Sequence, residues 1–174
     1  MKRFLIVVDM QKDFVDGALG TPEAVAIVPA VCERIREFEG EIIVTYDTHP
    51  ENYLDTAEGK KLPVTHCVED TDGWQLDAQV AEALAGKAYL AIRKPTFGST
   101  DLPFLLHSIA GEENFDVTLI GLCTDICVVS NALLLKAYFP ETPISVVADC
   151  CAGVTPETHA AALQTMTMCQ IDVK

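Results

Sequence analysis

Short apolar runs recur along the chain, and each is bounded by polar residues or glycine. Runs of this length and composition are typical of buried parallel strands. They predict strands at residues 4–8, 41–46, 88–92, 117–121, 144–148 and 170–173.

Longer stretches with apolar residues at helical spacing lie between these runs. They predict helices at residues 22–38, 75–84, 101–109 and 124–138, and a further helix from Thr155 onward. Thr21 is expected to cap the first, Thr100 or Asp101 the third, and Thr155-Pro156-Glu157 has the composition of a helix start. Residues 48–73 form a long irregular section with Pro50, Gly59 and Pro63.

Alternation of strands and helices implies a parallel sheet with right-handed crossovers. We therefore predict a Rossmann-like α/β fold with three layers, α/β/α, and a mostly parallel sheet of about six strands. The chain has 174 residues and shows no repeat, low-complexity tract or linker. One domain spanning residues 1–174 is expected.

Ionisable and nucleophilic residues stand at the ends of four predicted strands. Asp9 follows the first, Asp47 and His49 the second, Lys94 the third, and the turn 121–127 the fourth. In parallel sheets, ligands bind beyond the carboxyl ends of the strands. This coincidence is the main sequence argument for an active site.

The stretch 117–132 predicts a strand, a tight turn and a helix, with Cys127 in the first helical turn. The unpaired N–H groups of a helix start favour a thiolate, the reactive form of cysteine. Lys94 would further favour the thiolate, and Asp9 could take and return a proton. Such a set suits attack on a carbonyl carbon. Taken singly, each of these residues is more often a turn, core or surface residue.

Asp47, His49 and His66 offer one carboxylate and two imidazoles, a donor set that suits Zn²⁺, Fe²⁺ or Mn²⁺. On the residues alone, hydrogen-bonding or surface roles for the two histidines remain equally open.

The amino-acid composition limits the classes of binding partner and the cellular compartment that we expect. The formal charge of −14, from 26 acidic and 12 basic residues, argues against nucleic acid or an anionic membrane as a partner. Seven cysteines without a CxxC pair, and no export signal, indicate reduced thiols in the cytoplasm and argue against a thiol redox protein. The apolar run 133–135, with Tyr138 and Phe139, suggests a subunit interface and hence a homo-oligomer.

Several motifs together resemble the isochorismatase-like cysteine hydrolases, and among them the nicotinamidases. In chain order the matching pieces are Asp9-Met10-Gln11-Lys12-Asp13-Phe14, Asp47-Thr48-His49, His66-Cys67, Lys94-Pro95-Thr96-Phe97 and Gly121-Leu122-Cys123-Thr124-Asp125-Ile126-Cys127-Val128. The set spans nearly the whole chain and is specific, although no single piece is.

The resemblance implies an isochorismatase-like fold and a catalytic triad of Asp9, Lys94 and Cys127. It also implies a cis peptide between Leu122 and Cys123, which aims the amides of Cys123 and Cys127 at the oxyanion. One divalent ion, zinc first and manganese or iron next, is expected on Asp47, His49 and His66, with Glu58 as a further ligand. No organic cofactor is expected.

The reaction implied is hydrolysis of nicotinamide to nicotinate and ammonia through a thioester. Phe14, Phe97, Tyr53, Leu122 and Cys123 are the expected substrate-binding residues. Thr48 and the segment 62–65 depart from the aromatic residues common in nicotinamidases, which bears on the substrate. Two alternatives stay open: another family hydrolase, cleaving carbamoyl or ureido amides or a vinyl ether, and a non-catalytic metal- or ligand-binding protein on this fold.

Overall fold

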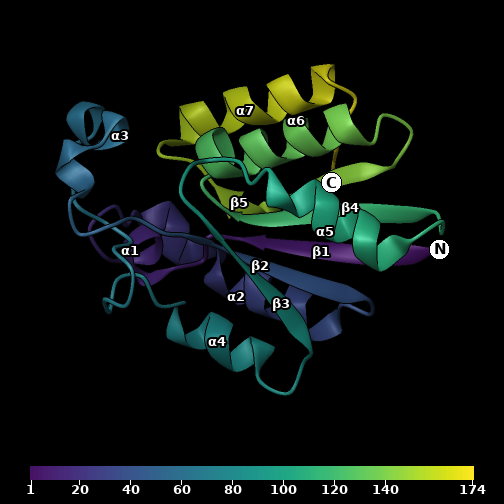
Figure 1. The fold of residues 1–174 in the computed structure, drawn as a ribbon, viewed down its shortest axis with the longest axis horizontal. Coiled ribbons are helices and arrows are strands. Elements are labelled where there is room, and N and C mark those ends of the chain that lie inside the picture. The colour runs from purple at the N-terminus through teal and green to yellow at the C-terminus, as the bar shows by residue number, and fades with distance from the viewer.

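The computed structural model describes residues 1–174 and is built around one six-stranded sheet in the order β3-β2-β1-β4-β5-β6 (Figure 1). Every neighbouring pair is parallel. The strands are β1 (Lys2–Val8), β2 (Glu41–Asp47), β3 (Tyr89–Lys94), β4 (Phe115–Leu122), β5 (Ile144–Ala152) and β6 (Asp172–Val173). The predicted fold class is confirmed.

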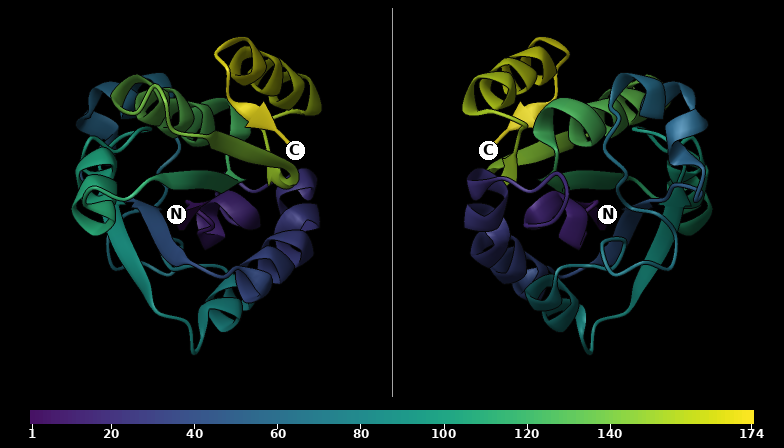
Figure 2. Two further views of the ribbon diagram at one scale, coloured as in Figure 1. Left: turned by 90° about the vertical axis from the view of Figure 1, so that its right-hand side faces the viewer. Right: turned by 90° about the vertical axis from the view of Figure 1, so that its left-hand side faces the viewer.

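Helices cover both faces of the sheet (Figure 2). One face carries α1 (Lys12–Val15), α2 (Pro22–Glu37) and α4 (Ala78–Leu84), and the other carries α5 (Asp101–Ala110), α6 (Val129–Tyr138) and α7 (Pro156–Met168). The short α3 (Ala57–Lys61) and a 3-10 turn (Tyr53–Asp55) lie at the carboxyl edge of the sheet (Figure 1). None of the helices is long and apolar enough to cross a membrane.

Strand β1 lies at the centre and explains why its sequence is apolar without alternation. Leu5 and Val7 pack into the core beneath α2, whereas Phe4, Ile6 and Val8 pack into the core beneath α5 and α6. All five side chains are fully buried. A strand covered on both faces gains from burying every residue, so period-two patterning disappears.

Two helix starts follow their predicted caps. Thr21 Oγ1 accepts a hydrogen bond from the Ala24 N–H (3.0 Å), and Pro22 occupies the first helical turn. Thr155 and Thr158 form a reciprocal capping box at α7. The expectation for α5 was wrong in its detail, because Thr100 has helical backbone angles and its side chain makes no capping bond.

Other elements differ from the sequence prediction in extent. β5 continues through Asp149 to Ala152, past the predicted end at residue 148, because its pairing with β4 shifts register between Leu119 and Gly121 and then resumes. The helix expected from residue 124 begins with a π-helical turn (Thr124–Val128) before α6. Such turns are common at functional sites.

Candidate active site and metal centre

The carboxyl ends of three strands bring Asp9, Lys94 and Cys127 into contact. Lys94 Nζ lies 2.6 Å from Asp9 Oδ2 and 3.4 Å from Cys127 Sγ. All three residues are buried, with exposed fractions of 0%, 1% and 4% for Asp9, Lys94 and Cys127. The parallel sheet therefore unites groups that are 85 and 33 positions apart, as expected for strands that end at one edge.

Asp9 is held in one orientation by its surroundings. Its backbone lies in the left-handed region (φ 46°), which turns the chain away from β1. The Thr45 hydroxyl donates to Asp9 Oδ1 (2.6 Å), and the Lys94 ammonium lies 2.6 Å from Asp9 Oδ2. Oδ1 therefore accepts a hydroxyl proton, while Oδ2 faces Lys94, whose Nζ also contacts Cys127 Sγ.

Burial and charge set the proton positions in this cluster. Burial, together with the Asp9 carboxylate, raises the pKa of Cys127 well above its usual value, although the Lys94 ammonium opposes the shift. Burial also raises the pKa of Asp9, against the effect of Lys94. The sequence led us to expect a resting thiolate. Burial instead favours the protonated sulfur, so formation of the thiolate is favoured when a neighbouring group takes the thiol proton.

The turn after β4 places Cys127. Gly121 has φ 116°, and a Cβ at this position would lie 2.1 Å from the Val8 carbonyl oxygen, so only glycine allows β4 to pass β1 here. The next peptide, between Leu122 and Cys123, is cis. The amides of Ile126 and Val128 both donate to the Cys123 carbonyl oxygen and close the turn.

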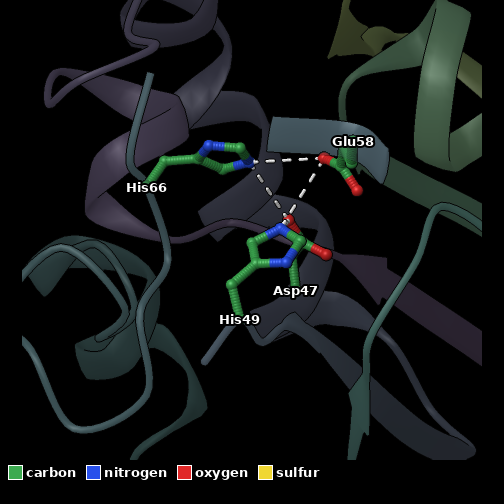
Figure 3. Close-up of side chains that lie close together, drawn as sticks. All are labelled: Asp47, His49, Glu58 and His66. Carbon is green, nitrogen blue, oxygen red and sulfur yellow. Dashed lines mark hydrogen bonds and ion pairs between the residues drawn. The ribbon is translucent and has the colours of Figure 1, made fainter. Parts of the chain in front are cut away.

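Asp47, His49, Glu58 and His66 form a second cluster (Figure 3). It lies beside the first, because Lys94 Nζ is 3.4 Å from Asp47 Oδ1. One ligand-type atom from each residue lies within 4.8 Å of all the others. His49 Nε2 is 2.8 Å from Asp47 Oδ2, and His66 Nε2 is 3.5 Å from the same oxygen. Glu58 Oε1 is 3.7 Å from His49 Nε2 and 3.8 Å from His66 Nε2.

These separations fit a divalent ion. Tetrahedral bonds of about 2.0–2.2 Å place neighbouring ligand atoms about 3.3–3.6 Å apart, within the range found here. His66 Nδ1 lies 2.7 Å from the Val64 carbonyl oxygen, which can only accept, so this nitrogen carries the proton and Nε2 turns its lone pair to the cluster. Although burial opposes a charge on Asp47, its polar neighbours His49, His66 and Lys94 hold the pKa of its carboxyl well below its usual range.

A small cavity of about 40 Å³ joins the two clusters. Its walls include Asp47, Glu58 and His66 from one cluster and Cys127 from the other. Apolar side chains complete the walls: Phe14, Leu19, Leu62, Phe97 and Ile126, with Cys123 beside them. A wider groove of about 650 Å³ shares Glu58, Leu62, Phe97 and Ile126 with this cavity.

Three of the expected substrate-binding residues, Phe14, Phe97 and Cys123, line this cavity, and two do not. Tyr53 is fully buried behind the histidines, its ring 4.7 Å from that of His49 and 4.9 Å from that of His66, and its hydroxyl donates to the Leu62 carbonyl oxygen. Leu122 points into the core beneath α2.

Asn131 is a structural partner of the site that sequence reasoning missed. It is fully buried, and its side-chain amide donates to the carbonyl oxygens of Cys127 (2.8 Å) and Phe97 (3.2 Å). Its Oδ1 accepts from the Ser99 N–H (2.9 Å). Asn131 thereby ties the Cys127 turn to the segment that follows Lys94. An asparagine inside an apolar helical run was the only signal in the sequence.

Fold and site together describe an α/β enzyme with a buried Asp–Lys–Cys cluster and an adjoining group of metal-type ligands. The isochorismatase domain model matches residues 3–173, and the chain belongs to the isochorismatase family.

Two curated proteins are similar in sequence to this chain over nearly its whole length. The chain is 27% identical to the nicotinamidase/pyrazinamidase of Mycobacterium tuberculosis, over 98% of this chain and 97% of that protein. It is 30% identical to a Bacillus subtilis isochorismatase family protein, PncA, of uncharacterized function, over 94% and 93%.

Solved structures of pyrazinamidases and nicotinamidases are also similar to this chain. The pyrazinamidase of Pyrococcus horikoshii in complex with zinc superposes with a TM-score of 0.84 at 30% identity, covering 100% of this chain and 99% of that one. For a Bacillus subtilis nicotinamidase/pyrazinamidase the TM-score is 0.85 at 26% identity, covering 99% of each chain. The predicted membership of the nicotinamidase-like branch, and the prediction of a hydrolase, are confirmed.

Proposed function

We propose that the protein hydrolyses the C–N bond of a small carboxamide, with nicotinamide as the favoured substrate. The observation that carries the proposal is the single cavity that exposes both Cys127 and the Asp47–Glu58–His66 side of the ligand cluster. A substrate bound there meets a nucleophile and a binding centre at once. The similarity to nicotinamidase/pyrazinamidase supports the choice of substrate.

In the proposed mechanism Cys127 is the nucleophile and Asp9 the proton carrier. Sγ attacks the carboxamide carbon while its proton passes to Asp9 Oδ2. The C–N bond then breaks, and Asp9 returns the proton to the departing nitrogen, which leaves as ammonia. Water attacks the resulting thioester, gives one proton to Asp9, and releases the carboxylic acid. Asp9 then returns that proton to the sulfur.

Lys94 supports both stages without giving up a proton. Although burial opposes its charge, the Asp9 and Cys127 groups raise the pKa of Lys94 above its usual range, so the ammonium persists. Its position 3.4 Å from Sγ stabilises the sulfur as negative charge develops there. In this proposal the amides of Cys123 and Cys127 receive the oxyanion.

Asp47, His49 and His66 are proposed to hold one divalent ion, with Glu58 as a fourth ligand. Zinc is the favoured ion, because the donor set of two imidazoles and carboxylates suits it and the similar Pyrococcus pyrazinamidase is in complex with zinc. When bound, the ion supplies a Lewis-acid site for the ring nitrogen of the substrate. Phe14, Leu19 and Leu62 supply the apolar surfaces around the ring.

The test is ammonia release from purified, zinc-loaded protein with millimolar nicotinamide, run beside Cys127→Ala. Turnover by the wild type and none by the variant is expected. A wild-type protein that releases no ammonia at this concentration would remove nicotinamide as the substrate.

A ureido or carbamoyl amide is the second candidate substrate. The N-carbamoylsarcosine amidase of Thermoplasma acidophilum superposes with a TM-score of 0.76 at 28% identity, covering 100% of this chain and 96% of that one. An N-carbamoyl amino acid in the same assay separates the two, since greater turnover with that compound would favour the second candidate. Vinyl ether cleavage and a purely binding role both predict no ammonia from either.

We also propose a cytoplasmic location and a homo-oligomer. The seven cysteines form no disulfide, in keeping with a reducing compartment. Phe104 and Tyr138 are 63% and 47% exposed and contact each other on neighbouring helices α5 and α6, in keeping with a subunit interface there. Sedimentation of the purified protein tests the oligomer.

A further inference from the structure

Gln11 joins the end of β1 to the first metal-type ligand. It is fully buried, yet its side chain makes three hydrogen bonds to backbone groups. Oε1 accepts from the Asp47 N–H (2.8 Å), while Nε2 donates to the carbonyl oxygens of Asp47 (2.8 Å) and Trp74 (2.9 Å). Both polar groups of the Asp47 backbone are thereby fixed by one amide.

Asp13 acts in the same way on the segment that carries His66. Its Oδ2 accepts from the Cys67 N–H (2.8 Å), and the Cys67 carbonyl oxygen accepts from the His49 N–H (2.9 Å). The peptide groups of Cys67 therefore connect the two histidines. Cys67 is fully buried and has φ 45°, a conformation that a residue with a Cβ keeps only when its surroundings impose it.

Gly73 packs tightly against the Asp13 carboxylate. A Cβ on Gly73 would lie 2.2 Å from Asp13 Oδ2, so no other residue can stand there without displacing the carboxylate. The Asp13 N–H also donates to the Gly73 carbonyl oxygen (3.0 Å). Neither Gln11 nor Asp13 lines the cavity. Both act on the backbone around the ligands and make no contact with the reacting groups.

We infer that Gln11 and Asp13 are positioning residues that set the spacing of Asp47, His49 and His66 for a metal ion. The inference rests on the proposed metal centre. Three ligands supplied by β2 and an irregular loop need their separations fixed to within a fraction of an ångström. Only Asp47 lies in the sheet, and an isolated bridge to Val68 ties His49 to the His66 segment without fixing that segment to the sheet. Residues 11 and 13 supply the missing constraint from a single short segment.

The test is the zinc dissociation constant of the full chain, measured by competition with a chromophoric chelator. Asp13→Ala and Gln11→Met are expected to weaken zinc binding by about 10- to 100-fold, the usual effect of removing a group that orients a ligand. Asp13→Asn keeps an oxygen for the Cys67 N–H and is expected to stay within about threefold of wild type. With Co²⁺ in place of zinc, the visible spectrum should change in the first two variants only.

Asp77→Ala is the matched control. The Asp77 carboxylate accepts from the amides of Gln79 (2.9 Å) and Val80 (3.2 Å) at the start of α4, so its loss removes the same kind of bond outside the ligand segments. It should lower the melting temperature and leave zinc affinity unchanged. Equal weakening in Asp77→Ala and Asp13→Ala would reduce Asp13 to a general stabiliser and overturn the inference.

Other outcomes are equally decisive. Wild-type zinc affinity in Asp13→Ala and Gln11→Met, or a wild-type protein that binds no zinc, would overturn the inference. If Asp13→Ala does not fold, Gln11→Glu tests the inference at residue 11 instead. A carboxylate there keeps the acceptor for the Asp47 N–H and loses both donors, so zinc binding should again weaken. Normal zinc data with no hydrolysis of nicotinamide would count against the proposed substrate alone.

Discussion

The two neighbouring clusters of the site are built in different ways. Asp9 and Lys94 stand at the ends of β1 and β3, and Cys127 lies in the turn that follows β4, so sheet pairing brings the three positions to one edge. Of the four metal-type ligands only Asp47 belongs to a strand. His49, Glu58 and His66 come from the connection between β2 and α4.

The difference shows in the burial of Glu58 and in dependence on support from other segments. The side chains of Asp9 and Lys94 are 0% exposed, whereas that of Glu58 is 20% exposed on the five-residue helix α3. Parallel strands give a fixed geometry as a by-product of folding. A loop must have its geometry imposed, here by Tyr53 behind the imidazoles and by Gln11 and Asp13 beneath them. Perturbations should therefore separate the two clusters.

Cys127→Ala should produce the largest effect and leave the ligand cluster untouched. Loss of the nucleophile is expected to reduce ammonia release by about 10⁴-fold or more. Zinc affinity should stay at the wild-type value, because Cys127 contributes no ligand. Cys151→Ala, which removes another buried thiol, is the control and should retain turnover.

Lys94→Met should damage both clusters, because Lys94 Nζ also lies 3.4 Å from Asp47 Oδ1. Removing one partner of a buried ion pair costs about 3–5 kcal/mol of unfolding free energy, measurable by urea denaturation. Adding Asp9→Asn should recover part of this stability and none of the turnover. A single variant as stable as wild type would show that the pair is not a buried one in solution.

Asp9→Asn separates proton transfer from thiol ionisation. Turnover should fall by about 10³-fold, since the departing nitrogen loses its proton donor. The pKa of Cys127 should fall as well, because the Asp9 carboxylate is one of the groups that raise it and the Lys94 ammonium remains. Thiolate absorbance near 240 nm, titrated against a Cys127→Ala background, measures this. An increase in the pKa would contradict the assigned charges.

Removal of the metal should affect substrate positioning while sparing the thiol. Chelation is expected to lower kcat/KM by about 10²-fold, the scale of effect that follows from misplacing a substrate. The rate at which iodoacetamide alkylates Cys127 should change little. A large change in that rate would show that the two clusters act as one unit.

Tyr53→Phe should give the smallest effect and report on the loop alone. The variant loses the hydrogen bond to the Leu62 carbonyl oxygen and keeps the ring against both imidazoles. A loss of about 0.5–1.5 kcal/mol in unfolding free energy is expected, with turnover near wild type. Differential scanning calorimetry measures the loss.

The same contrast explains which features the sequence could predict. Buried strands leave apolar runs, and the rule that parallel strands end together placed Asp9, Lys94 and the Cys127 turn at one edge. Leu122 was expected among the substrate-binding residues, but it belongs to β4 and is fully buried. Once β4 includes Leu122, strand alternation puts its side chain on the same face as that of Ile120, in the core beneath α2.

The geometry of the loops was harder to predict from the sequence. Tyr53 has the composition of a pocket wall, and only the fold shows that its hydroxyl turns back to its own loop. The roles of Gln11 and Asp13 depend on backbone groups of Asp47 and Cys67, which leave no trace in residue type. Asn131 poses the same difficulty, because its partners are carbonyl oxygens and an amide.

The position of Lys94 has a consequence for heat inactivation. β3 is the edge strand of the sheet, paired on one side only, and Tyr89 and Leu90 at its start are 41% and 45% exposed. Edge elements open at lower free energy than a central strand does. When β3 detaches, the ammonium leaves with it while β1 and β4 stay paired. On warming, the enzyme should therefore lose activity at a temperature several degrees below the one at which its circular dichroism changes. The activity should return on cooling.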